Sequence, residues 1–106
     1  MTILVTGTID FDPTKRDDAV AAVKAVMAAT RAEDGNEGYV FSGDLEDEGR
    51  FHVTEHWASQ EAIDAHMATP HMATPHMATL MGQMGTLGVT AASLTKWEGA
   101  TPSKLM

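Results

Sequence analysis

Apolar and polar residues alternate at the start of the chain. Between residues 2 and 11, Ile3, Val5 and Ile9 share one side with Gly7, whereas mostly polar residues take the other side. A period of two residues over this length predicts a β-strand with one face directed toward a core.

The pattern then changes to the longer period of a helix. Asp12 followed by Pro13 is typical of a helix start, because aspartate caps free N–H groups and proline fits the first helical position. We expect this helix over residues 13–33, with a stop at residues 34–36, Asp-Gly-Asn. At about 100° per residue, its inward-facing residues fall within an arc of about 120°. They are Ala19, Val20, Val23, Val26, Met27 and Thr30.

Two further alternating runs cover residues 39–46 and 51–57, and the charged, glycine-containing stretch between them is typical of a hairpin turn. One side of the hairpin carries Tyr39, Phe41, Phe51, Val53, Glu55 and Trp57. The other side carries Val40, Ser42, His52, Thr54 and His56. Because the first side is the more apolar, we expect it to lie beneath the helices.

The rest of the chain predicts a second helix and a last strand. Ser59 is a typical helix cap, and residues 89–97 form an apolar and β-branched run. The inner face of this second helix would carry Ala62, Ile63, His66 and Thr69. The order β-α-β-β-α-β predicts a ferredoxin-like α+β fold, with an antiparallel four-stranded sheet and two main helices on one face. We expect one domain over residues 1–99 and a C-terminal tail over residues 100–106.

In such a fold the sheet face away from the helices is bare in a monomer. Burying that face against a second copy would explain its mixture of apolar and uncharged polar residues. We therefore expect a homodimer, with His52 and His56 at the subunit interface.

Composition restricts the possible partners and chemistry. The 106 residues suit one domain, and 15 acidic against 7 basic residues give a net charge of -8. This charge disfavours nucleic acids and anionic membranes as partners. The absence of cysteine excludes disulfides, thiolate metal sites and thiol catalysis. With no signal peptide or membrane-spanning run expected, we predict a cytoplasmic protein.

Three five-residue units, HMATP, HMATP and HMATL, follow one another over residues 66–80. Five residues advance a helix by about 500°, so successive histidines would lie about 140° apart rather than on one face. We interpret the repeat as a tandem duplication tolerated at the surface, and the alternatives are one functional ligand histidine or a multi-histidine metal site.

Three motifs lie between residues 39 and 77: Y-V-F-S-x-D-L, F-H-V-x-E-x-W-x-S-x-E-A and A-H-x-x-T-P-H-M. With these motifs and this order of elements, the chain resembles the antibiotic biosynthesis monooxygenase (ABM) family, whose quinol-monooxygenase-like members are dimeric α+β barrels. The matching residues are Tyr39, Phe41, Asp44, Phe51, Glu55, Trp57, Ser59, Glu61, Ala62, His66, Pro70 and His71. The resemblance implies a pocket between sheet and helices, and oxygenation of quinol-like or polyketide aromatic substrates by molecular oxygen without metal or flavin.

Oxygenation without a cofactor requires a base, because a phenolate or quinolate gives an electron to oxygen more readily than the neutral molecule does. On this interpretation His66 is the catalytic base, in a pocket that excludes water. The expected substrate-binding residues are Tyr39, Phe41, Glu55, Trp57, His71 and His76, with no metal ligand and no cofactor. Because the T-P-H unit occurs twice, either His71 or His76 could be the second histidine of the family.

Other interpretations of the same residues stay open. His66 could be a core histidine bonded to Glu55 or to a backbone group, and Glu55 could be paired, to His66 or Arg50, or have a raised pKa. Tyr39 and Trp57 could pack in the core rather than stack on a ligand. The second candidate function is a non-catalytic, dimeric ligand-binding protein of the same fold. A heme-degrading relative is the weakest candidate, because such relatives use an asparagine that the first predicted strand lacks.

Overall fold

The computed structural model of the chain describes residues 2–69 and 88–106, within which four strands form one antiparallel sheet. The strands are β1 (Thr2–Asp10), β2 (Asn36–Gly43), β3 (Arg50–Trp57) and β4 (Ala91–Ala100). Their order across the sheet is β2-β3-β1-β4, so the two central strands come from distant parts of the sequence. This arrangement confirms the ferredoxin-like α+β fold.

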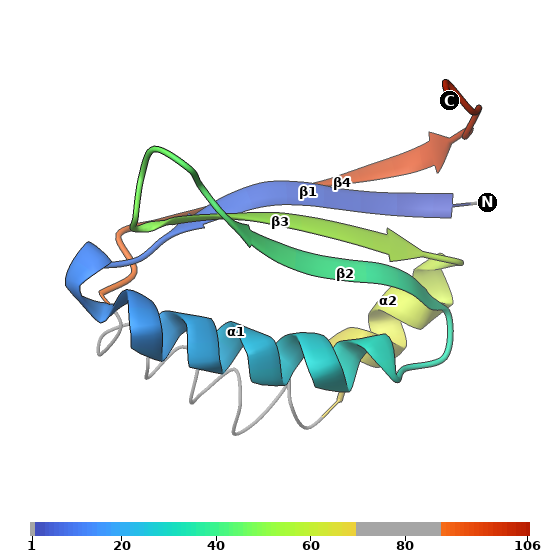
Figure 1. The fold of residues 1–106 in the computed structure, drawn as a ribbon. Coiled ribbons are helices and arrows are strands. Elements are labelled where there is room, and N and C mark those ends of the chain that lie inside the picture. The colour runs from blue at the N-terminus through green and yellow to red at the C-terminus, as the bar shows by residue number, and fades with distance from the viewer. Residues whose placement is uncertain (1, 70–87) are drawn as a thin grey trace.

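Two helices, α1 (Arg16–Arg31) and α2 (Gln60–Met67), cover one face of the sheet (Figure 1). A short 3-10 turn, η1 (Pro13–Lys15), precedes α1. The Asp12 carboxylate accepts a hydrogen bond of 2.9 Å from the backbone N–H of Thr14, so it caps this turn rather than the longer helix. The sequence predicted one helix over residues 13–33. The structure instead has a 3-10 turn followed by an α-helix, and this α-helix ends two residues before the predicted end.

The boundaries of β2 differ from the prediction at both ends. Gly35 has a φ of 81°, which turns the chain directly out of the helix region and lets the strand begin at Asn36 rather than Tyr39. At the other end, the Asp44 carboxylate accepts hydrogen bonds from two backbone N–H groups of the following turn, at 2.8 and 2.9 Å. These bonds turn the chain immediately after Gly43, three residues before the predicted end.

The last strand is also displaced from its predicted bounds, but toward higher residue numbers, because pairing with β1 sets where it begins and ends. β4 pairs with β1 from Asp10 opposite Ala91 to Thr2 opposite Ala100, so it begins and ends later than residues 89–97. The backbone N–H of Thr90 donates to the Asp10 carbonyl at 3.0 Å, just before the strand starts.

The core lies between the helices and the inner face of the sheet. One buried cluster contains Phe11, Ala19, Val23 and Phe51, and the other contains Ile3, Val26, Tyr39 and Trp57. Along β3, buried residues alternate strictly with exposed ones, as the sequence pattern predicted. Each large apolar side chain buried in this way contributes about 1.5–3 kcal/mol to folding.

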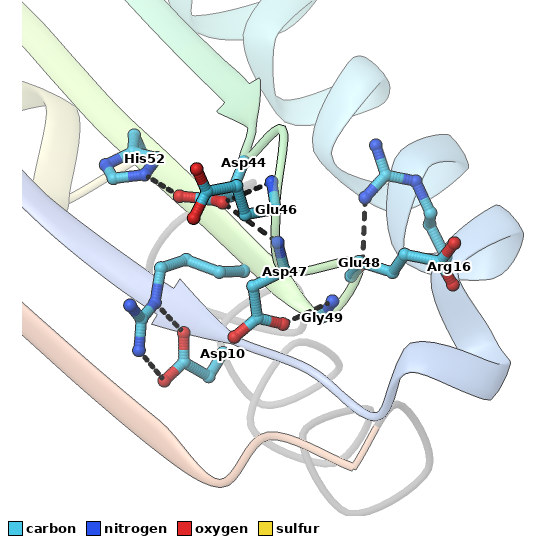
Figure 2. Close-up of polar contacts among 9 residues, drawn as sticks. Asp10, Arg16, Asp44, Glu46, Asp47, Glu48, Gly49 and His52 are labelled. Atoms are coloured by element: carbon cyan, nitrogen blue, oxygen red, sulfur yellow. Dashed lines mark hydrogen bonds and ion pairs between the residues drawn. The ribbon is translucent and has the colours of Figure 1, made fainter.

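Charged residues form hydrogen bonds and ion pairs at the end of the sheet where the β2–β3 hairpin turns (Figure 2). The Arg50 guanidinium bonds both carboxylate oxygens of Asp10, at 2.8 and 3.2 Å, and so joins β3 to β1. From the helix side, Arg16 donates to the Glu48 carbonyl at 2.8 Å. The hairpin is thus tied both to the neighbouring strand and to the start of α1.

Residues 101–106 form neither helix nor strand and are exposed. Within the described ranges, no helix combines the length and apolar character needed to cross a membrane.

Candidate active site

A mainly apolar cavity of about 360 Å³ lies between the sheet and the helices. Four of the residues expected to contact substrate or catalyse line it: Tyr39, Phe41, Glu55 and His66. The remaining lining residues are Val5, Ile9, Phe11, Val23, Val26, Val53, Ile63, Met67, Val89, Ala92, Leu94 and Lys96. The strict alternation of β3 and the inner face of α2 bring these side chains together, so the cavity follows from the periodicities of the sequence.

His66 lies on the inner face of α2, and only 3% of its surface is exposed. Its Nδ1 atom is 2.6 Å from Oε2 of Glu33, a residue just beyond the end of α1. This short hydrogen bond holds the ring orientation and favours the tautomer that carries its proton on Nδ1.

Two aromatic rings pack beside His66. The centroid of its ring is 4.7 Å from that of Trp57 and 5.7 Å from that of Tyr39, both at tilted angles. Trp57 is fully buried and is not among the residues that line the cavity. Its contact with His66 therefore supports the histidine within the core, whereas Tyr39 and Phe41 face the cavity itself.

The partner of Glu55 differs from both predicted partners. Its Oε1 atom accepts a hydrogen bond of 2.9 Å from the indole N–H of Trp57, whereas His66 bonds Glu33. Arg50 bonds Asp10 instead, because residues 50 and 55 of one strand point to opposite faces of the sheet. Burial raises the pKa of Glu55, although the Trp57 hydrogen bond and the nearby His66 oppose this effect.

The Tyr39 hydroxyl is held in its neutral form. Burial raises the pKa of this phenol well above its usual range, and the charges of Glu55 and Glu33 raise it further. A neutral hydroxyl at the cavity wall can donate a hydrogen bond to a ligand oxygen.

Glu33 belongs to this site, although it was not among the site residues predicted from the sequence. The signal was present, because Val26, Thr30 and Glu33 continue the inward-facing stripe of the first helix at spacings of four and three. An acidic residue on such a stripe is directed toward the core and requires a partner there.

Other histidines lie apart from the cavity or outside the described ranges. His52 and His56 point to the outer face of the sheet, and Nε2 of His52 is 2.8 Å from the Asp44 carboxylate (Figure 2). His71 and His76 belong to the repeat and lie outside the described residues. Across residues 2–69 and 88–106, no three histidine, aspartate or glutamate side chains are grouped to hold a metal ion.

Comparisons with known proteins agree with this fold. The family model of antibiotic biosynthesis monooxygenases matches residues 2–77. The uncharacterized protein sll1783 of Synechocystis sp. is 31% identical over 68 residues, which cover 64% of this chain. That match spans 46% of sll1783, so the chain covers less than half the length of this relative.

Solved structures share the fold over almost the whole chain. A candidate antibiotic biosynthesis monooxygenase from Deinococcus radiodurans is 27% identical, with a TM-score of 0.85 over 98% of both chains. Rv0793 from Mycobacterium tuberculosis is 24% identical, with a TM-score of 0.79 over 98% of this chain and 100% of that one. Since the family model covers well over half of the sequence, the chain belongs to the antibiotic biosynthesis monooxygenase family.

Proposed function

We propose that this protein is a cofactor-independent monooxygenase that oxidises a small aromatic, quinol-like or polyketide-like, with molecular oxygen. The observation that carries this proposal is a buried histidine at the wall of a mainly apolar cavity, with Nδ1 held by Glu33 at 2.6 Å. Family membership supports the same reaction class.

The chemistry needs a proton acceptor and a dry chamber. Nε2 of His66 would take the proton of a bound phenol or quinol, and the resulting anion would give an electron to oxygen. For a hydroquinone, one oxygen atom enters the ring as a hydroxyl, the ring becomes a quinone, and the second oxygen leaves as water. The substrate itself supplies every electron in this balance.

The cavity wall supports these steps. Tyr39 and Phe41 offer aromatic surfaces for an offset-stacked ring, and the neutral Tyr39 hydroxyl can donate to a substrate oxygen. Trp57 would act through its contact with His66 rather than by touching the ligand. We retain His71 and His76 as the candidates for the second histidine of the family.

We further propose that the protein works as a cytoplasmic homodimer, with the outer sheet face as its interface. The outer face carries the 54% exposed side chain of Trp97, whose indole N–H donates to the Thr6 hydroxyl at 2.9 Å. A half-exposed tryptophan on a sheet face suits burial against a second sheet.

The second candidate is a binding protein of the same fold without turnover. The close packing of His66 between Trp57, Tyr39 and Glu33 favours it, because a histidine can fill this position for structural reasons alone.

Oxygen uptake with a panel of hydroquinones separates the two functions. If His66 is the base, His66→Gln should lower turnover by about 100-fold or more while the thermal melt still shows a folded protein. Lys24→Gln, which changes an exposed residue of α1 away from the cavity and from the proposed interface, is the control and should retain turnover. Hydroquinone binding without oxygen consumption by the wild type would instead support the binding protein.

A further inference from the structure

One row of residues crosses the inner face of the sheet from edge to edge. The strand register places Tyr39 opposite Glu55, Glu55 opposite Val5, and Val5 opposite Lys96. All four residues line the cavity. The backbones at Glu55 and Lys96 are two strand spacings apart, which is about 10 Å. A glutamate and a lysine thus lie in one row of the cavity wall, with an aliphatic side chain between them.

Lys96 is the only lysine or arginine among the described residues that line the cavity. Its Nζ atom is 2.8 Å from Oε1 of Gln60, at the start of α2, and 2.8 Å from Oε1 of Glu98. The Lys96 and Glu98 side chains are 41% and 61% exposed. Exposed ion pairs contribute only about 0–1 kcal/mol, so an arriving anion can replace Glu98 at small cost.

The other end of the row has the opposite polarity. Glu55 lines the cavity beside His66, and the Glu33 carboxylate lies directly behind that histidine. Two carboxyl groups disfavour an anion at this end, whereas a hydroxyl can donate to Nε2 or to a carboxylate oxygen. A ligand with one acidic substituent is therefore oriented with that substituent toward Lys96 and its hydroxyl toward His66.

We propose that the cavity takes a hydroxylated aromatic carboxylic acid, whose carboxylate is bound by Lys96 while its hydroxyl faces His66. The middle of the row is lined by Val5, so the ring between the two polar groups meets an apolar wall. This inference rests on the proposed function, which places the reacting hydroxyl at His66, and adds the charge and orientation of the substrate.

Calorimetric titration with para-hydroxybenzoate and with its methyl ester tests the inference, because the two probes differ mainly in the negative charge. The wild type should bind the acid about fivefold more tightly than the ester, and added salt should reduce only this difference. Lys96→Met keeps the length of the side chain and removes its charge, so the acid should lose its advantage. Glu98→Gln removes the competing carboxylate, so the acid should bind more tightly than it binds the wild type.

Gln60→Ala is the control for a purely structural role of Lys96, since it breaks the link to α2 and leaves the ammonium in place. The acid should keep its preference in this variant. Equal affinity of the wild type for acid and ester, or unchanged discrimination in Lys96→Met, would overturn the inference. In either case hydroquinone-dependent oxygen uptake would still support the proposed monooxygenase, whereas its absence would count against that function separately.

Discussion

At the scale of single residues, the hydrogen bond between His66 and Glu33 predicts which tautomer the imidazole ring of His66 adopts. Nitrogen NMR of the histidine ring should show the tautomer protonated on Nδ1 in the wild type, because Glu33 accepts from that atom at 2.6 Å. Glu33→Gln should weaken this preference and lower hydroquinone turnover by up to about 100-fold through misplacement of the base. A variant with the wild-type tautomer and full turnover would show that Glu33 does not position His66.

The buried carboxyl of Glu55 gives a pH-dependent prediction. Its pKa is raised by burial, so the folded state holds this proton more tightly than the unfolded state does. The contribution of the protonated Glu55 carboxyl to the free energy of unfolding is therefore fully present below the unfolded pKa of about 4.5. This contribution is lost as pH rises through the folded pKa. Glu55→Gln keeps an acceptor for the Trp57 N–H and removes this loss.

Thermal melts between about pH 4 and pH 8 measure the effect. The melting temperature of Glu55→Gln relative to the wild type should rise as pH increases. Glu55→Leu is the matched control, because it leaves the Trp57 N–H without its acceptor and should be less stable than Glu55→Gln at every pH. A relative melting temperature that stays flat with pH would contradict the prediction.

The sequence could predict which residues face the cavity, but it did not identify their partners. A period of two placed Tyr39, Phe41 and Glu55 on one face, and the helical period placed His66 inward. Pairing depends on where the end of α1 meets α2, a tertiary distance that local periodicity does not contain. For that reason the sequence pattern left His66 and Arg50 as alternative partners of Glu55. In the structure, Trp57 donates to Glu55, and Glu33 bonds His66.

At the scale of elements, the β2–β3 hairpin has an acid-sensitive turn. The pKa of Asp44 is lowered to about 2, chiefly by its hydrogen bond to His52 and further by the backbone N–H groups of Glu46 and Asp47. The ionised carboxylate thus stabilises the fold above the unfolded pKa of about 4, and this contribution is lost as pH falls toward 2.

Asp44→Asn should therefore be less stable than the wild type at neutral pH and nearly equal to it near pH 2. Thermal melts across this range measure the convergence. His52→Ala separates the two causes, because it removes the side-chain hydrogen bond to Asp44 and leaves the backbone hydrogen bonds of the turn. Parallel melting curves for Asp44→Asn and the wild type across the range would refute this account.

The order of the helices and strands could be predicted from the sequence, whereas the residues at which they begin and end could not. Alternation in β3 and the cap at Ser59 were sufficient to identify their elements, and the Ser59 hydroxyl accepts from the Ala62 N–H at 3.1 Å. The ends of β2 and β4 depend on the conformation of Gly35, the bonds of Asp44 and the length of β1. Two of these three are local features with recognisable chemistry, and the third is a long-range pairing.

At the scale of the whole molecule, both helices of the described residues lie on one face of the sheet (Figure 1). The opposite face is the interface of the proposed dimer. A row of Val40, Thr54, Thr6 and Thr95 crosses this outer face without a charged residue. Charged side chains stand toward the hairpin end, where His52 and Arg50 bond acidic partners. The uncharged centre and the charged margin resemble the core and rim of a protein interface.

Thr54 lies on a central strand of this face and is exposed, so it tests the proposed interface directly. The wild type should sediment as a dimer at micromolar concentration, with a total buried area of about 1,500 Å² or more. In a symmetric dimer, Thr54→Glu introduces two like charges into one desolvated interface and should shift the protein to a monomer that keeps its secondary structure. Lys24→Glu adds an acidic residue on the exposed side of α1 and should remain dimeric. A wild-type monomer at micromolar concentration would remove the dimer from the proposed function, and a dimeric Thr54→Glu variant would place the interface elsewhere on the molecule.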